Sequence, residues 1–142
     1  MPPIDAFRYF CNSRIIEPMR SVRPSEQSDV TRYANMFAAL GTEPRLRIMR
    51  TLLAAHPEGM VVGEIQSELG IAPSTLSHHL EKLKNEDLIT VRRESNFLRY
   101  RANTAALEEL LGFLYAECCT RNHAIEPQKI VQACSERKKR WS

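Results

Sequence analysis

Two short helices followed by a hairpin, between residues 62 and 101, constrain the fold of this 142-residue chain more than any other feature. Residues 62–69 carry apolar side chains on one helical face, and Gly70 follows as a helix end. After a turn, residues 73–86 predict a second helix because their apolar stripe recurs at i, i+4 and i+7: Leu76, Leu80 and Leu83. A helix, a tight turn and a second helix with a polar outer surface are typical of a helix-turn-helix.

A hairpin is predicted directly after these helices. Residues 88–93 and 97–101 have strand composition, and the polar turn Glu94-Ser95-Asn96 joins them. Alternation along the second strand places Leu98 and Tyr100 on one face and Arg99 and Arg101 on the other. The sequence therefore predicts a mainly α fold with one β-hairpin, a winged helix-turn-helix.

Further helices are expected on both sides of this motif. Residues 30–40 have helical apolar spacing, and Thr42 is a candidate N-cap for the next helix, with Pro44 in its first turn. The expected buried stripe of that helix is Leu46, Met49, Leu52 and Leu53. A long helix is predicted over 104–120, with more apolar positions than one small core needs: Leu107, Leu110, Leu111, Leu114 and Tyr115. We expect a partly disordered arm at 1–29, the winged helix domain at 30–121 and a tail at 122–142.

The net charge of +3 excludes a strongly basic nucleic-acid tail as the basis of function. Residues 1–30 and 31–113 each hold equal numbers of basic and acidic side chains, so the whole surplus lies after residue 113. A nucleic-acid surface in the central domain must then be a local concentration of charge. No run approaches the ~20 apolar residues that span a bilayer, so we expect a cytoplasmic protein without membrane contact.

Such a concentration is predicted on the second helix and the hairpin. A helix that enters the major groove needs small hydrogen-bonding side chains on its outer face, and a basic hairpin contacts phosphates or the minor groove. The candidate DNA-contacting residues are Ser74, Thr75, Ser77, His78 and Lys82 on the helix, and Arg92, Arg93, Arg99 and Arg101 on the hairpin. A protein-interaction module of the same fold, with a solvated arginine-rich hairpin, is the alternative. His79 borders the apolar stripe and is interpreted as structural.

Three segments resemble the ArsR/SmtB family of winged-helix repressors: Ala39–Ile48 (ALGTEPRLRI), Ser74–Leu80 (STLSHHL) and Arg99-Tyr100-Arg101. The similarity extends over about residues 31–120. The resemblance implies a homodimer on a palindromic double-stranded operator, with the first and last helices of the domain at the dimer interface. It also implies release from DNA when a metal or metalloid binds.

The cysteines differ from two branches of that family and are similar to a third. The Cys-x-Cys site of many arsenite repressors is replaced by Val61-Val62-Gly63, and residues 104–120 hold no histidine for the zinc site of the last helix. Cys118-Cys119 is similar to a branch of arsenic-responsive repressors with a C-terminal cysteine pair. The nearby third cysteine of that branch is missing here. Cys134 or Cys11, from either subunit, remains as a third ligand.

Thiolates are the expected ligands of trivalent arsenic and antimony, which are soft and three-coordinate. Two thiolates suffice for an organoarsenical, whereas arsenite requires a third sulfur. Adjacent helical residues point ~100° apart, so the helix must unwind at Cys118 for both sulfurs to reach one arsenic. We therefore expect a trivalent arsenical or antimonite as inducer and no required cofactor. The alternatives are packing cysteines and a thiol redox or persulfide sensor. An enzyme is not expected, because the sequence holds no nucleophile–base arrangement and no phosphate loop.

Overall fold

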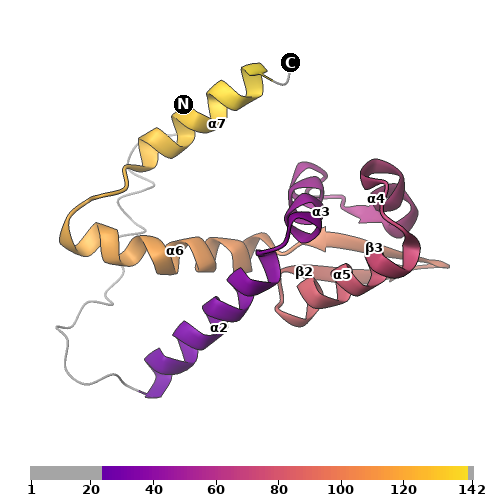
Figure 1. Cartoon of the computed structure of the whole chain (residues 1–142), viewed down its shortest axis with the longest axis horizontal. Coiled ribbons are helices and arrows are strands. Elements are labelled where there is room, and N and C mark those ends of the chain that lie inside the picture. Colours follow the sequence, from indigo (N-terminus) through magenta and orange to yellow (C-terminus); the bar gives the residue numbers. More distant parts are fainter. Residues whose placement is uncertain (1–23, 141–142) are drawn as a thin grey trace. The chain divides into compact units, whose positions relative to one another are not determined.

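The computed structural model describes residues 24–140, with the side chains of 24–27, 118–119 and 138–140 outside the described part. Its elements in chain order are α2 (Pro24–Leu40), α3 (Glu43–Ala54), β1 (Met60–Val61), α4 (Val62–Leu69), α5 (Pro73–Asn85), β2 (Ile89–Glu94), β3 (Phe97–Ala102), α6 (Thr104–Arg121) and α7 (Pro127–Arg140) (Figure 1). The chain divides into two compact units. The described part of one unit is residues 24–110, and that of the other is residues 111–140.

The winged helix-turn-helix prediction is confirmed within residues 24–110. Gly70 ends α4 in the left-handed conformation at φ 63°, and its N–H donates to the Gln66 carbonyl at 2.8 Å. Helix α5 begins at Pro73, where the missing N–H has no intrahelical partner to lose. The hairpin follows as β2 and β3, with Arg92 opposite Arg99.

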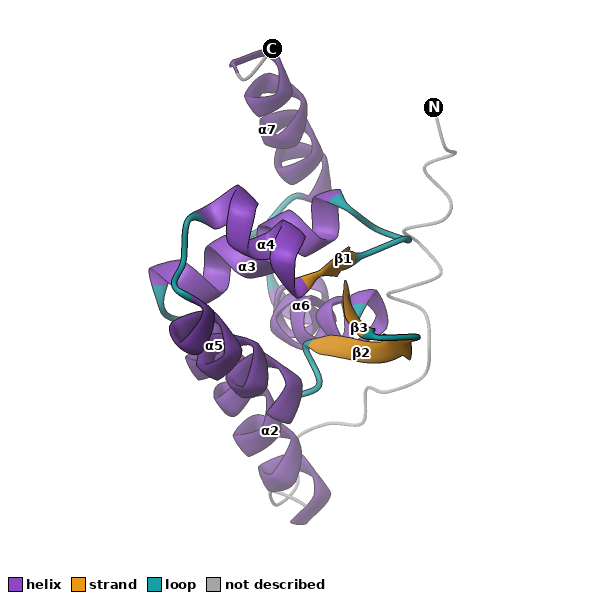
Figure 2. Ribbon diagram, turned by 90° about the vertical axis from the view of Figure 1, so that its right-hand side faces the viewer, coloured by secondary structure: helices purple, strands orange, loops and turns teal. Residues whose placement is uncertain are grey.

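A third strand was not predicted. β1 pairs antiparallel with β3, so that the sheet order is β1-β3-β2 (Figure 2). Met60 lies opposite Tyr100 and Val61 opposite Arg99. Since α4 begins at the residue after β1, this pairing joins the wing directly to the first helix of the helix-turn-helix.

One apolar core lies beneath these elements. The stripe of α5 is fully buried as predicted. It belongs to one cluster with buried side chains of α2, α3, α4, β2, β3, α6 and the turn before β2: Met36, Ala39, Ile48, Met49, Leu52, Ile65, Leu88, Ile89, Ala102, Ala106 and Leu110. The prediction for α3 was wrong at one position. Leu46 is 49% exposed, and Ile48 is buried in its place. The apolar residues between 46 and 53 fit two overlapping helical faces, one with Leu46 and one with Ile48. Only tertiary packing determines which of the two faces is buried.

The junction of α2 and α3 depends on Arg45 rather than on a side-chain cap. Thr42 stands at the N-cap with extended backbone, but its hydroxyl makes no capping hydrogen bond. The guanidinium of Arg45 donates to the carbonyls of Ala39 and Ala38, the second at 3.1 Å. Both carbonyls belong to the last turn of α2, and that of Ala38 also accepts the Gly41 N–H at 3.3 Å. Arg45 thus caps the end of one helix from the next.

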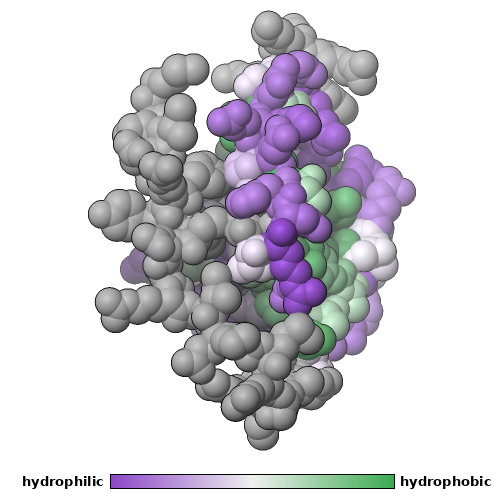
Figure 3. Space-filling view, turned by 90° about the vertical axis from the view of Figure 1, so that its left-hand side faces the viewer, coloured by the Kyte–Doolittle hydropathy of each residue, from purple (hydrophilic) through white to green (hydrophobic). Residues whose placement is uncertain are grey.

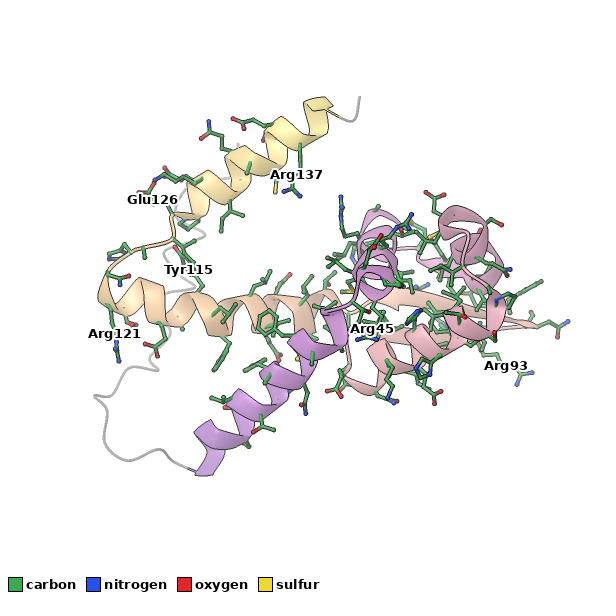
Figure 4. All side chains as sticks on the ribbon, viewed as in Figure 1. Arg45, Arg93, Tyr115, Arg121, Glu126 and Arg137 are labelled. Atoms are coloured by element: carbon green, nitrogen blue, oxygen red, sulfur yellow. The ribbon has the colours of Figure 1, made fainter. Side chains whose placement is uncertain are left out.

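The segments outside the core contain more helix than expected. Helix α2 begins at Pro24, six residues before the predicted start, and α7 occupies most of the segment predicted as a tail. The remainder of the expected arm lies outside the described residues. In the second unit, the Tyr115 hydroxyl donates to the Ile125 carbonyl at 3.1 Å, joining the last turns of α6 to the segment before α7 (Figure 4).

Candidate DNA-binding surface

The outer face of α5 presents the side chains that were predicted to contact DNA. Ser74, Thr75, Ser77, His78 and Lys82 are all exposed, on the side opposite the buried leucine stripe. The Ser77 hydroxyl donates to the Pro73 carbonyl at 3.0 Å, which leaves its oxygen able to accept. No acidic residue lies in the first turn of α5. The N-terminal half of this helix is therefore polar, small and without negative charge, as a helix in the major groove requires.

His79 is half-buried at the edge of the same helix, as the sequence predicted for a structural residue. Its Nδ1 atom is buried without a hydrogen-bond partner. Burial lowers the pKa of the imidazole, and the positive charge of Arg45 lowers that pKa further. Both effects favour the neutral form of the His79 ring.

The four arginines of the wing fall into two pairs. Arg92 and Arg93 are exposed on β2, and Arg93 projects outward from the hairpin (Figure 4). Its Nε donates to the Ser95 carbonyl at 3.3 Å, within the turn. As neighbours on one strand, the two side chains point to opposite faces of the sheet, with Arg92 on the face of Glu94, whose pKa its charge also lowers. Both are exposed and therefore accessible to a phosphate backbone.

Arg99 and Arg101 are instead held by protein acceptors. Arg99 Nε donates to Glu94 Oε2 at 2.7 Å, and Arg99 Nη1 donates to the Gly59 carbonyl at 3.3 Å. Arg101 Nε donates to the Glu58 carbonyl at 3.1 Å, and its Nη2 lies 3.8 Å from Glu94 Oε1. These two arginines lie on the wing as predicted, but two guanidinium nitrogens of each contact acceptors of the protein.

Two carboxylates that the sequence analysis did not single out organise this part of the site. The hydrogen bond from Arg99 holds the pKa of Glu94 below its usual range, and the same bond raises the pKa of Arg99. Glu64 Oε2 accepts the Val61 N–H at 2.8 Å at the start of α4, and its charge also favours the guanidinium of Arg99. The sheet register places Glu94 on the same face as Arg99, because Arg92, two residues before Glu94, lies opposite Arg99. Alternation along one strand does not give this register, so the sequence alone did not point to the pair.

The predicted cysteine ligands are only partly described. Cys118 and Cys119 lie in the last turn of α6, but their side chains, like the whole of Cys11, are outside the described residues. Cys134 is exposed on α7. Among the side chains that the structure describes, no group of three or more His, Cys, Asp or Glu could hold a metal ion. None of the described helices is long and apolar enough to cross a membrane.

Known proteins similar to this chain share its fold and motif. A family model described as a helix-turn-helix domain matches residues 40–92. The nodulation protein NolR of Rhizobium meliloti is 28% identical over 121 residues, covering 85% of this chain and 97% of NolR. A biofilm growth-associated repressor of Xylella fastidiosa is 31% identical over 88 residues, covering 62% of this chain and 75% of the repressor.

A solved structure described as reduced HlyU from Vibrio cholerae superimposes with a TM-score of 0.52 at 29% identity, covering 66% of this chain and 98% of HlyU. These relatives include proteins named as regulators of transcription, which agrees with the expectation that the chain is not an enzyme. These similarities agree with the wing and the helix-turn-helix that the structure shows. The chain belongs to the ArsR/SmtB-like family of winged helix-turn-helix transcriptional regulators.

Proposed function

We propose that the protein is a transcriptional repressor that binds double-stranded DNA through α5 and the wing. The observation that carries this proposal is the exposed Ser/Thr/His face of α5 in the same unit as the exposed Arg92 and Arg93. The polar helix face supplies base contacts, and the arginines supply phosphate contacts. The Xylella fastidiosa relative and SdpR of Bacillus subtilis are named as repressors, whereas HlyU of Vibrio cholerae is named as an activator. We propose repression because the 31% identical relative is a repressor.

The repressor acts as a homodimer on a palindromic operator. Apolar side chains reach solvent on α2 at Val30 and Phe37, and on α6 at Leu111 and Leu114. Figure 3 shows one face of the molecule, on which green, apolar surface lies next to purple, polar surface among the described residues. A structurally similar mycobacterial domain is described as homodimeric. Burial of such side chains between two subunits would stabilise a dimer, and a dimer brings two copies of α5 to the two half-sites of a palindrome.

The inducer is a trivalent arsenical or antimonite bound by Cys118 and Cys119, with Cys134 or Cys11 as a third ligand for arsenite. Support comes from the chemistry of the adjacent thiols and from their place in the last turn of α6, where few hydrogen bonds oppose unwinding. To release the operator, the inducer must bind the DNA-free form of the protein more tightly than the DNA-bound form, by about 1–3 kcal/mol.

A thiol redox or persulfide response is a second candidate. The description of one HlyU structure as the reduced form favours it, since that protein has a redox state worth distinguishing. Adjacent cysteines form a strained disulfide, so oxidation would pair one of them with a more distant thiol such as Cys134.

One titration separates these functions. The DNA is a duplex that wild-type protein selects from a random-sequence library, and release is followed by fluorescence anisotropy. Arsenite, a methylated trivalent arsenical, antimonite, zinc, hydrogen peroxide and a persulfide donor are added to the reduced protein. Each compound is titrated into wild type and into the single variants Cys118→Ser, Cys119→Ser, Cys134→Ser and Cys11→Ser.

We expect trivalent arsenicals to release the duplex and zinc to leave it bound. Cys118→Ser and Cys119→Ser should raise the half-release concentration at least about tenfold, equivalent to 1.4 kcal/mol of lost binding. Unchanged release in both variants would reject the cysteine pair. Release by peroxide or persulfide alone would establish the second candidate. Failure of the library to yield any preferred sequence would reject sequence-specific DNA binding.

A further inference from the structure

Glu94 holds two arginines of the wing at once. It is the last residue of β2, and both guanidinium groups come from β3 on the same face of the sheet. The contacts are 2.7 Å from Arg99 Nε to Oε2 and 3.8 Å from Arg101 Nη2 to Oε1. The Arg99 side chain is 26% exposed and the Arg101 side chain is 36% exposed, whereas Arg92 and Arg93 are exposed residues. A carboxylate shared in this way offsets the charge that the two arginines would offer to DNA.

The same arginines continue beyond the hairpin. Arg99 reaches the carbonyl of Gly59, and Arg101 reaches that of Glu58, in the loop that connects α3 to β1. Charged donors to carbonyls form stronger hydrogen bonds than neutral ones. The loop leads within two residues to α4, the first helix of the helix-turn-helix. The contacts therefore connect the wing to α4, the helix that precedes α5 in the helix-turn-helix.

Gly59 makes this connection possible. Its φ of +75° is left-handed, and a Cβ built there would overlap the Tyr100 carbonyl oxygen and the Arg101 side chain. The loop approaches β3 at a distance that only a glycine allows. Arg99 and Arg101 therefore bridge the loop carbonyls beside Gly59 and the carboxylate of Glu94 across β3.

We propose that Arg99, Arg101 and Glu94 form a positioning clamp that fixes the wing relative to the helix-turn-helix. In this clamp the two arginines are not phosphate contacts. The phosphate contacts of the wing are Arg92 and Arg93. The proposal rests on the proposed DNA-binding function for its effect, but the clamp itself is a property of the protein without DNA.

The first test measures the salt dependence of binding to the library-selected duplex and to an unrelated duplex of equal length. Each phosphate contact contributes about 0.9 to the slope of log K against log salt concentration. Arg92→Gln and Arg93→Gln should each lower the slope by about that amount per bound protomer. Arg99→Gln and Arg101→Gln should leave the slope unchanged and reduce the ratio of selected to unrelated affinity about tenfold, because a loosened wing no longer fixes the docking geometry.

The second test is independent of DNA. Hydrogen exchange of the 58–61 and 99–101 amides is compared among wild type, Glu94→Gln and Glu58→Gln. The matched control, Glu58→Gln, removes a charge from the same loop but keeps the carbonyl that Arg101 uses. Glu94→Gln should accelerate exchange about 2- to 5-fold, and Glu58→Gln should not. Equal exchange in all three proteins would overturn the clamp.

Arg99→Lys separates charge from geometry. Lysine keeps the positive charge but cannot donate in a fork to Glu94 and Gly59 together. The clamp requires faster exchange and a lower affinity ratio in this variant. A slope that falls in Arg99→Gln and is restored in Arg99→Lys would show a phosphate contact and reject the proposal. Absence of DNA binding by wild type, with the exchange results as expected, would reject the proposed function and leave the clamp standing.

Discussion

At Gly59 the lack of a side chain allows the α3–β1 loop to lie against β3. Gly59→Ala would force a Cβ into the Tyr100 carbonyl while retaining a left-handed backbone. We expect the free energy of unfolding to fall by about 1–3 kcal/mol, since strain and overlap act together. Urea denaturation measures this loss.

Gly63 is the matched control for that substitution. A Cβ at Gly63 meets no atom within 4 Å, and its position in α4 has ordinary helical backbone. Gly63→Ala should raise the free energy of unfolding by about 0.5–1 kcal/mol. An equal loss from both substitutions would show that the contact of Gly59 with β3 does not determine the effect.

His79 gives the protein a predictable pH response. Burial, followed by the charges of Arg45 and His78, lowers its pKa in the folded state. The unfolded chain then binds the proton at higher pH than the folded one, so stability declines as the pH falls below about 6.5. The decline ends once folded His79 is also protonated.

NMR titration of the His79 ring checks the direction of this shift. Arg45→Met should raise the pKa of His79 without restoring its ordinary value, because burial remains. An exposed-arginine control, Arg47→Met, should leave the pKa of His79 unchanged, since Arg47 pairs with Glu43 at 3.9 Å. A wild-type pKa at or above 6.5 would contradict the burial seen at Nδ1.

At the scale of the element, the two faces of α5 perform separate tasks. Leu80 is 1% exposed in the core, whereas Thr75 points to solvent. Leu80→Ala should lower the free energy of unfolding by about 2–5 kcal/mol through the cavity it leaves. Thr75→Ala should leave stability within about 0.5 kcal/mol and reduce affinity for the selected duplex more than for an unrelated one. Equal loss on both duplexes would place Thr75 outside the base-reading face.

Periodicity predicted the elements with strong patterns and missed those without one. The stripe of α5, the hairpin and α6 follow from spacing that repeats over several turns or residues. β1 has two residues, too few for alternation to be visible, and it is a strand because β3 offers it hydrogen bonds. Helix α7 was missed because its many charges resemble those of a solvated tail.

The sequence predicted which residues make up the candidate site, but it did not predict which acceptors the wing arginines contact. Alternation correctly placed Arg99 and Arg101 on one strand face. It could not show that Glu94 and the Gly59 carbonyl lie within reach, because those acceptors depend on the register of the sheet and on a loop some 40 residues earlier. Which arginines are available to DNA is thus a tertiary property.

At the scale of the whole molecule, the apolar residues on α6 exceed what the core of one chain uses. Leu110 is fully buried, yet Leu111 and Leu114 are 56% and 52% exposed. Burial of such side chains between subunits stabilises a dimer by about 25 cal/mol per Å² of apolar surface, before the cost of association. Leu114→Glu should therefore convert a dimer into a monomer in sedimentation experiments while leaving thermal unfolding of the monomer nearly unchanged.

Leu46→Glu provides the control, because Leu46 is 49% exposed on α3 and belongs to no proposed interface. This variant should remain a dimer and bind DNA as wild type does. In Leu114→Glu, the salt slope of DNA binding should fall to about half, since a monomer carries one wing and one copy of α5 to the duplex. A Leu114→Glu protein that stays dimeric would remove Leu114 from the interface. A monomer with an unchanged slope would show that a single protomer makes all the DNA contacts, and would remove the dimer as the route by which chemistry at Cys118-Cys119 is proposed to reach the DNA.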